Sequence, residues 1–149
     1  MVSGALDDTK ADDAIARLVA EAGGGRDHLT VHLTNVAGSV GAALALHDVI
    51  RQLAVPVHVV GTGMLGTAGA IVMKAGAEGH RRLLPSGRIH LRQPDEPSTP
   101  DLELEQAAKE VAFLRDRAEE VLGTPLHPPR MLGAHDAVAL GIADPSPVE

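Results

Sequence analysis

Short apolar segments typical of β-strands alternate with helical segments along most of this chain. Strand-like segments lie at residues 28–33, 55–63 and 87–94, and segments with helical spacing of apolar residues lie at 11–22, 40–53 and 67–76. Repeated β-α-β alternation is typical of a largely parallel sheet with helices on its faces. The alternation therefore predicts the α/β fold class.

The core of such a fold must here be built from aliphatic side chains. Hydrophobic residues make up 44% of the 149 residues, aromatic residues make up 1%, and Phe113 is the single aromatic ring. A chain of this length is expected to form one domain with one core. We therefore expect close approach between helices and strands through small side chains.

Composition also excludes several classes of function. The formal charge of −7 argues against a nucleic-acid partner, because binding to phosphates requires clustered Lys and Arg. The chain has no cysteine, which excludes disulfides and thiolate chemistry, and none of its predicted helices carries two histidines at the i, i+4 spacing of a metal pair. No apolar run reaches the roughly 20 residues that span a bilayer. We expect a soluble cytoplasmic protein with no membrane partner, no cofactor and no metal site.

The C-terminal third departs from the alternation. A Pro-rich acidic segment at 93–100 precedes a predicted long helix at 101–123, and a short helix is predicted near 133–140 before a proline-broken end. The long helix has one apolar face, formed by Leu104, Ala107, Ala108, Val111, Leu114, Ala118 and Val121. We predict a single domain over 1–149, with a head at 1–94 and 124–149 from which this helix leaves.

Two glycine-containing turns lead from predicted strands into predicted helices. The first, "NVAGS" (35–39), ends at Ser39, which we predict to be the N-cap of the helix at 40–53. The second, "GTGMLGT" (61–67), ends at Thr67. Thr67 has two interpretations, a cap on the helix that it begins or a nucleophile, and we favour the cap.

Several blocks of the sequence resemble the Clp protease proteolytic subunit family. The blocks are "LTNVAGSVGAALALHDVIRQL", "GTGMLGTAGAIVMKAGAEGHRRLLPSGRIHLRQP", "DLELEQAAKEVAFLRDRAEEVLG" and "AVALGIAD". The resemblance covers nearly the whole chain. It implies a ClpP-like, crotonase-like fold of stacked β-β-α units, with the long helix as a protruding handle through which two rings meet.

The same resemblance implies a Ser-His-Asp triad in the family, and all three positions are altered in this chain. Thr67 stands at the nucleophile position, Arg92 at the base position, and Pro129 at the position nearest to the aspartate, in a shortened segment. A guanidinium cannot accept a proton near neutrality, because its pKa exceeds about 12. We therefore expect a catalytically degenerate subunit, a serine-peptidase homologue that acts as a structural or regulatory protein.

Other interpretations remain open. His90, two residues before Arg92 on the predicted strand, is a candidate displaced base, although a strand histidine satisfied by a neighbour is favoured. His47 is interpreted as a residue at the solvent edge or an interface. With a displaced base of this kind, the chain would be an active peptidase or acyl hydrolase that uses Thr67 with an unorthodox base. A binding module for acidic or peptide-like ligands around Arg92 is a further alternative.

An oxyanion hole could survive without the triad. In the family, backbone amides of the glycine turn and of the residue after the serine form it, and the resemblance places these at Gly38 and Ala68. A crotonase-like enzyme that uses these two amides is therefore a second enzymatic alternative.

The resemblance also bears on partners. It implies a homo-oligomeric ring, or a mixed ring with a catalytic paralogue, and Phe113 either contacts another subunit or packs on its own head. The chain begins inside the family's first β-unit, without the N-terminal axial loops. Docking to an ATP-driven unfoldase is therefore doubtful.

Overall fold

A computed structural model describes residues 1–95 and 102–145. Residues 96–101 and 146–149, which include most of the predicted Pro-rich segment and the predicted frayed end, lie outside the described residues. The elements, in chain order, are β1 (Val2–Leu6), α1 (Asp8–Ala22), β2 (Leu29–Gly38), α2 (Val40–Gln52), β3 (Val57–Thr62), β4 (Met64–Leu65), α3 (Thr67–Ala75), β5 (Arg81–Leu83), β6 (Arg88–Leu91), α4 (Leu104–Leu122), β7 (Arg130–Gly133) and α5 (Ala134–Ala139).

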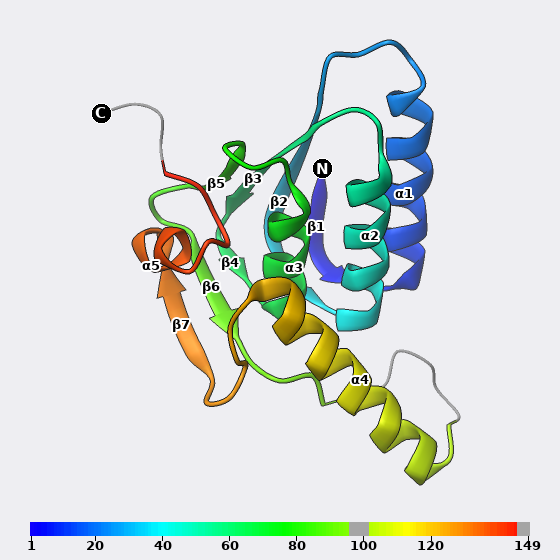
Figure 1. Cartoon of the computed structure of the whole chain (residues 1–149), viewed down its shortest axis with the longest axis vertical. Helices are drawn as coiled ribbons and strands as arrows, with labels where there is room; N and C mark the ends of the chain where they lie inside the picture. Colours follow the sequence, from blue (N-terminus) through cyan, green and yellow to red (C-terminus); the bar gives the residue numbers. More distant parts are fainter. Residues whose placement is uncertain (96–101, 146–149) are drawn as a thin grey trace.

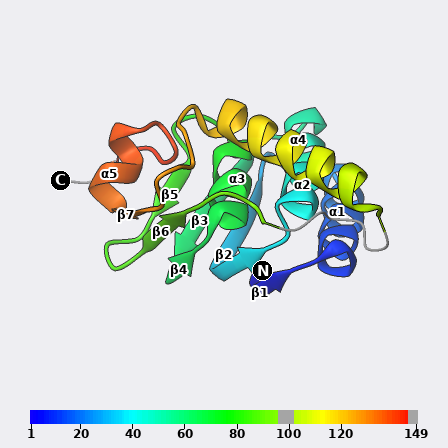
Figure 2. The same cartoon turned by 90° about the horizontal axis from the view of Figure 1, so that it is seen from below.

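The head is built on a parallel sheet with the strand order β1-β2-β3-β5. Helices α1, α2 and α3 lie on one face of this sheet (Figure 1 and Figure 2). A smaller sheet, β4-β6-β7, joins β4 to β6 in parallel and β6 to β7 in antiparallel orientation. The α/β class is confirmed.

Helix α3 forms the centre of the core, since nearly every residue along it is buried. Small residues on α3 allow the helix to lie at the centre of the core. A Cβ on Gly69 would stand 2.7 Å from the carbonyl oxygen of Val36 and 2.9 Å from Cβ of Leu65. The absence of a side chain at Gly69 therefore lets α3 approach the chain at β2 closely, as the aliphatic composition predicted.

The predicted boundaries need several corrections. The strand predicted at 55–63 is β3, and a short strand that was not predicted, β4, follows it after a bend at Gly63, where φ is 75°. The first helix begins at Asp8 rather than at residue 11, because Asp7 accepts a hydrogen bond from the Lys10 amide and caps it. Strands β1, β5 and β7 were not predicted. Ser39 is the N-cap of α2, as predicted, and accepts from the Ala42 amide at 3.1 Å.

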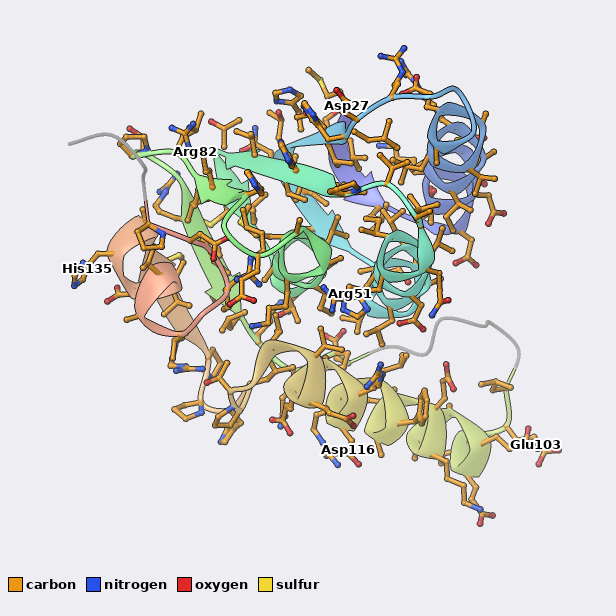
Figure 3. All side chains as sticks on the ribbon, turned by 45° about the horizontal axis from the view of Figure 1, so that its top comes forward. Asp27, Arg51, Arg82, Glu103, Asp116 and His135 are labelled. Atoms are coloured by element: carbon orange, nitrogen blue, oxygen red, sulfur yellow. The ribbon has the colours of Figure 1, made fainter. Side chains whose placement is uncertain are left out.

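Helix α4 leaves the head (Figure 1). Its buried residues, Leu114, Ala118 and Leu122, belong to its C-terminal half. At the other end Leu104 is 89% exposed, and Phe113 is 63% exposed, so its ring does not pack into the head. Figure 3 shows Glu103 at the free tip of this helix, away from the sheets. The N-terminal half of α4 thus presents apolar side chains to solvent.

Candidate functional site

The turn before α3 places Thr67 where parallel strand β3 and short strand β4 end. Gly66 is the N-cap of α3, and its amide donates to the Val36 carbonyl at 2.9 Å. This hydrogen bond ties the turn to the end of β2, where the other glycine-containing turn begins. The two turns that sequence analysis singled out are therefore adjacent in space.

The Thr67 hydroxyl is fully engaged by the backbone of Arg92. Oγ1 donates to the Arg92 carbonyl oxygen at 2.7 Å and accepts from the Arg92 amide at 3.0 Å. The side chain is nearly buried, because the residue is 6% exposed. These two bonds extend the β4–β6 pairing by one residue, through a side chain instead of a backbone.

The prediction that Thr67 caps α3 is wrong. Thr67 is the first residue inside the helix rather than its N-cap, and no side chain caps α3. The local rule for threonine at a helix start suggested a partner two or three residues later. The actual partner lies 25 residues later, on the strand segment after β6.

Arg92 presents its guanidinium to solvent. Its side chain is 62% exposed, and Nη1 lies 4.0 Å from Oδ2 of Asp95, which is also exposed. An exposed pair at this distance is worth little in stability. Arg92 therefore holds the Thr67 hydroxyl through its backbone, while its charge remains free to meet another group.

Pro129 and Arg92 each stand one residue beyond the paired strands β6 and β7, which run antiparallel with Leu91 opposite Arg130. No acid and no base stands at any of the three positions that the resemblance assigned to the triad, Thr67, Arg92 and Pro129.

A pocket of about 360 Å³ opens at this corner. It is lined by Ala37, Gly38, Ser39, Val40, Gly66, Thr67, Arg92, Gln93, Pro94 and Asp95. Gly38 has φ of 110°, and a Cβ there would lie 2.6 Å from the Leu6 carbonyl oxygen, so only glycine fits this turn. Ala68 is 1% exposed and is not among the lining residues. Of the two amides predicted to form an oxyanion hole, Gly38 lines the pocket and Ala68 lies behind it.

The candidate replacement bases lie elsewhere. His90 is on β6 opposite Met131 of β7 and does not line the pocket. His47, on α2, meets Oδ1 of the adjacent Asp48 through Nδ1 at 3.0 Å. Across residues 1–95 and 102–145, no imidazole forms a hydrogen bond with Thr67.

Sequence reasoning missed the residue that joins the two turns. Asn35 adopts φ of 51°, in the left-handed region, and its Oδ1 accepts from the Met64 amide at 2.9 Å. The left-handed conformation of Asn35 could have been expected, because asparagine tolerates that conformation better than most residues. Its partner could not be inferred, since it lies 29 residues away.

Sequence reasoning also missed a buried ion pair on the other side of β5. Arg81 donates to both carboxylate oxygens of Asp144, at 2.7 and 3.0 Å, and the amides of Gly79 and Arg81 donate to Oδ2. The hydrogen bond from Arg81, together with these amides, holds the pKa of Asp144 below its usual value, although burial acts in the opposite direction. We call this group the Asp144 clamp.

Within the described part of the chain, no group of three or more His, Cys, Asp and Glu residues is arranged to hold a metal ion. None of the described helices is both long and apolar enough to cross a membrane.

Comparisons with known proteins agree with this arrangement. The family model "Clp protease" matches residues 1–145. ATP-dependent Clp protease proteolytic subunit 1 of Corynebacterium diphtheriae is 31% identical, over 93% of this chain and 73% of that protein. Proteolytic subunit 2 of Streptomyces coelicolor is 30% identical, over 93% of this chain and 70% of that protein.

Proteolytic subunit 2 of Gluconobacter oxydans is 32% identical over 81% of this chain, and the match spans only 56% of that protein. The matched share of the relatives thus ranges from about half to about three quarters of their length. The family match extends over all the described elements, including both turns and the long helix. This chain therefore belongs to the Clp protease family.

Proposed function

We propose that this chain is a catalytically degenerate Clp proteolytic subunit, which contributes to a ring as a structural or regulatory member and does not cleave peptides. The observation that carries the proposal is the engagement of the Thr67 hydroxyl by the Arg92 backbone, as donor at 2.7 Å and as acceptor at 3.0 Å. A hydroxyl nucleophile needs a base that accepts its proton. Here the proton points to a carbonyl oxygen, which is no base.

The two other positions of the triad supply no substitute. Arg92 cannot be deprotonated near neutrality, and Pro129 has no side-chain acid. Removing triad members costs on the order of a million-fold in turnover, which leaves roughly a thousand-fold over water from binding and the oxyanion hole. A degenerate member is therefore expected to show no turnover in an ordinary peptidase assay.

Assembly is the second part of the proposal. Two large apolar side chains on α4, Leu104 and Phe113, are exposed where the helix leaves the head, and exposed apolar side chains are commonly buried between subunits. We propose that α4 contacts another subunit, in a homo-oligomeric ring or in a mixed ring with a catalytic paralogue. The proposed location is the cytoplasm. Light scattering at micromolar concentration should show an oligomer, and a monomer would contradict this part.

The decisive test of degeneracy is reactivity at Thr67. The chain is incubated with a fluorophosphonate or β-lactone probe and, separately, with short fluorogenic peptides. We expect neither labelling nor turnover. The matched variants are Thr67→Ala and Thr62→Ala, the second on the outer face of β3. Labelling or turnover that is lost in Thr67→Ala and kept in Thr62→Ala would overturn the proposal in favour of an active acyl hydrolase.

A second candidate function rests on the pocket itself. Arg92 lines a pocket of about 360 Å³, and among the described residues that line it Asp95 is the only one with a carboxylate. A guanidinium there fits the carboxylate of a peptide-like ligand. Calorimetry with a short peptide should show binding that is weakened by amidation of the peptide C-terminus and by Arg92→Gln, but not by Arg88→Gln. Equal binding of the free and amidated peptides would exclude this function.

A further inference from the structure

Three histidines that are far apart in sequence form a stacked column on the parallel sheet. The rings of His28 and His58 have centroids 4.1 Å apart at an interplanar angle of 14°. The rings of His58 and His80 have centroids 4.0 Å apart at 8°. His28 directly precedes β2, His58 is in β3, and His80 directly precedes β5. We call these three residues the histidine column.

The column lies on the sheet face opposite α1, α2 and α3. Residues that alternate with the buried core positions of β2, β3 and β5 point to this face, and His58 is half-buried on it while His28 and His80 are exposed. His32, from β2, and Arg82, from β5, project from the same face. Asp27 precedes His28, and Figure 3 shows Asp27 and Arg82 as separate side chains along this edge of the head.

The start of β5 depends on the column and on the Asp144 clamp. β5 is a three-residue strand at the edge of its sheet, paired with β3 alone in that sheet. On one side, the Asp144 carboxylate binds the amides of Gly79 and Arg81. On the other side, the His80 ring rests on His58, and the His80 carbonyl oxygen accepts from the Val59 amide at 2.9 Å.

We propose that the histidine column is a proton-sensitive latch, which fixes the start of β5 when its rings are neutral and loosens it when neighbouring rings become charged. Neutral imidazoles stack favourably at this spacing. Two adjacent imidazolium rings about 4 Å apart repel each other, and the sheet prevents them from separating without moving a strand. His58 is in contact with both other rings, so its protonation has the largest effect.

The electrostatics of His58 agree with this role. Burial lowers the pKa of His58 below the ordinary histidine value, and the neighbouring His80 and His28 lower it further. The unfolded chain therefore takes up a proton at this position before the folded chain does. Stability from this site is complete above the ordinary histidine pKa and is lost as the pH falls below it. The Asp144 clamp keeps its charge over the same range, because the pKa of Asp144 is lowered.

The Val59 amide reports directly on the latch, because its acceptor is the carbonyl oxygen of His80. Hydrogen exchange of the full chain is measured by NMR at about pH 7.5 and about pH 5.5, with metal chelator present and with correction for intrinsic rates. We expect the protection of Val59 to fall on acidification, while the buried Val72 amide in α3 keeps its protection. Unchanged protection of Val59 would overturn the proposal.

Two matched variants separate the column from general effects of acid. His58→Phe keeps an aromatic ring between His28 and His80 but cannot be protonated, and Val59 should then keep its protection at the lower pH. His32→Phe makes the same change on the same face outside the column, and should lose protection as the wild type does. If His58→Phe does not fold, His28→Phe takes its place and should reduce the loss. Equal loss in the column variant and in His32→Phe would refute the latch.

Discussion

Two corners of the head each contain an arginine, and they use it in opposite ways. At the Asp144 clamp, the Arg81 side chain is 9% exposed and donates to both oxygens of a carboxylate that is itself nearly buried. At the candidate site, the Arg92 side chain faces solvent and only its backbone meets Thr67. The clamp is a complete ionic unit that fixes structure. At the candidate site, the positions that the resemblance assigned to the triad are occupied by Thr67, Arg92 and Pro129.

The two corners differ in the groups that satisfy their buried polar side chains. At the clamp, the carboxylate accepts from two backbone amides and a guanidinium, so its charge is compensated. At the candidate site, the one buried polar side chain, Thr67, is satisfied by a backbone. In both arrangements the buried polar side chain has its hydrogen-bond partners within the fold.

Breaking the clamp should have the largest effect. Asp144→Asn leaves the buried Arg81 charge without its carboxylate, and removing one partner of a buried pair costs about 3–5 kcal/mol. Urea denaturation should show this loss of unfolding free energy. Asp136→Asn is the control, because Asp136 is exposed and, within the described residues, its carboxylate accepts only from the Gly133 amide, at 3.4 Å. A loss below about 1 kcal/mol in Asp144→Asn would mean that the clamp is not the stronger corner.

At low pH, Asp144→Asn and the wild type should have the same free energy of unfolding. Because the folded pKa of Asp144 is lowered, its contribution is complete above the ordinary aspartate pKa and is lost as the pH falls through the lowered value. Urea curves of both proteins should therefore converge only well below about pH 4. Convergence already near neutral pH would contradict the lowered pKa.

Removing the Thr67 hydroxyl should have an intermediate effect. Thr67→Val keeps the shape but leaves the amide and the carbonyl of Arg92 without their partner, which costs about 1–3 kcal/mol for buried groups. Thr62→Val, on the outer sheet face, is the matched control and should change stability by less than about 0.5 kcal/mol. Equal effects of the two substitutions would show that Thr67 is not a structural tie.

Removing the Arg92 side chain should have a small effect on stability. Its guanidinium is exposed and its ion pair with Asp95 is long, so Arg92→Ala should cost less than about 1 kcal/mol. Arg81→Ala, at the other corner, should cost several times more in the same urea assay. If Arg92→Ala lowered the free energy of unfolding as much as Arg81→Ala, the two arginine side chains would not differ in their contribution to stability.

Much of the fold follows from local pattern, and the parts that were missed depend on distant partners. Helix α2 and its cap Ser39 were predicted, because the apolar spacing and the capping rule act within a few residues. Strand β5 was not predicted, because it begins with two arginines. Arg81 is tolerated inside the head only through Asp144, 63 residues later.

The candidate site shows the same division. The resemblance identified Thr67, Arg92 and Pro129, and two hydrogen bonds join Thr67 to Arg92. The hydrogen bonds of Thr67 were wrongly predicted, because a helix-start rule considers only nearby amides. The histidine column had no sequence signal, since stacking joins three strands whose register is set by the whole sheet.

The most direct test of the central claim is the peptide turnover of the double variant Thr67→Ser, Arg92→His. It restores a nucleophile and a base at positions that the backbone already holds together. We predict no measurable gain, because Pro129 offers no acid to orient the histidine, and losing that orientation costs about ten-thousand-fold in triad enzymes.

Two further acids already have partners of their own. Asp136 contacts the Gly133 amide, and Glu105 lies 3.7 Å from Lys109 on the exposed helix α4. Steady-state cleavage of a fluorogenic peptide by the double variant should therefore equal the background rate of the wild type. Turnover within about a hundred-fold of an active family member would show that some group in this chain already orients the base, and would contradict the account.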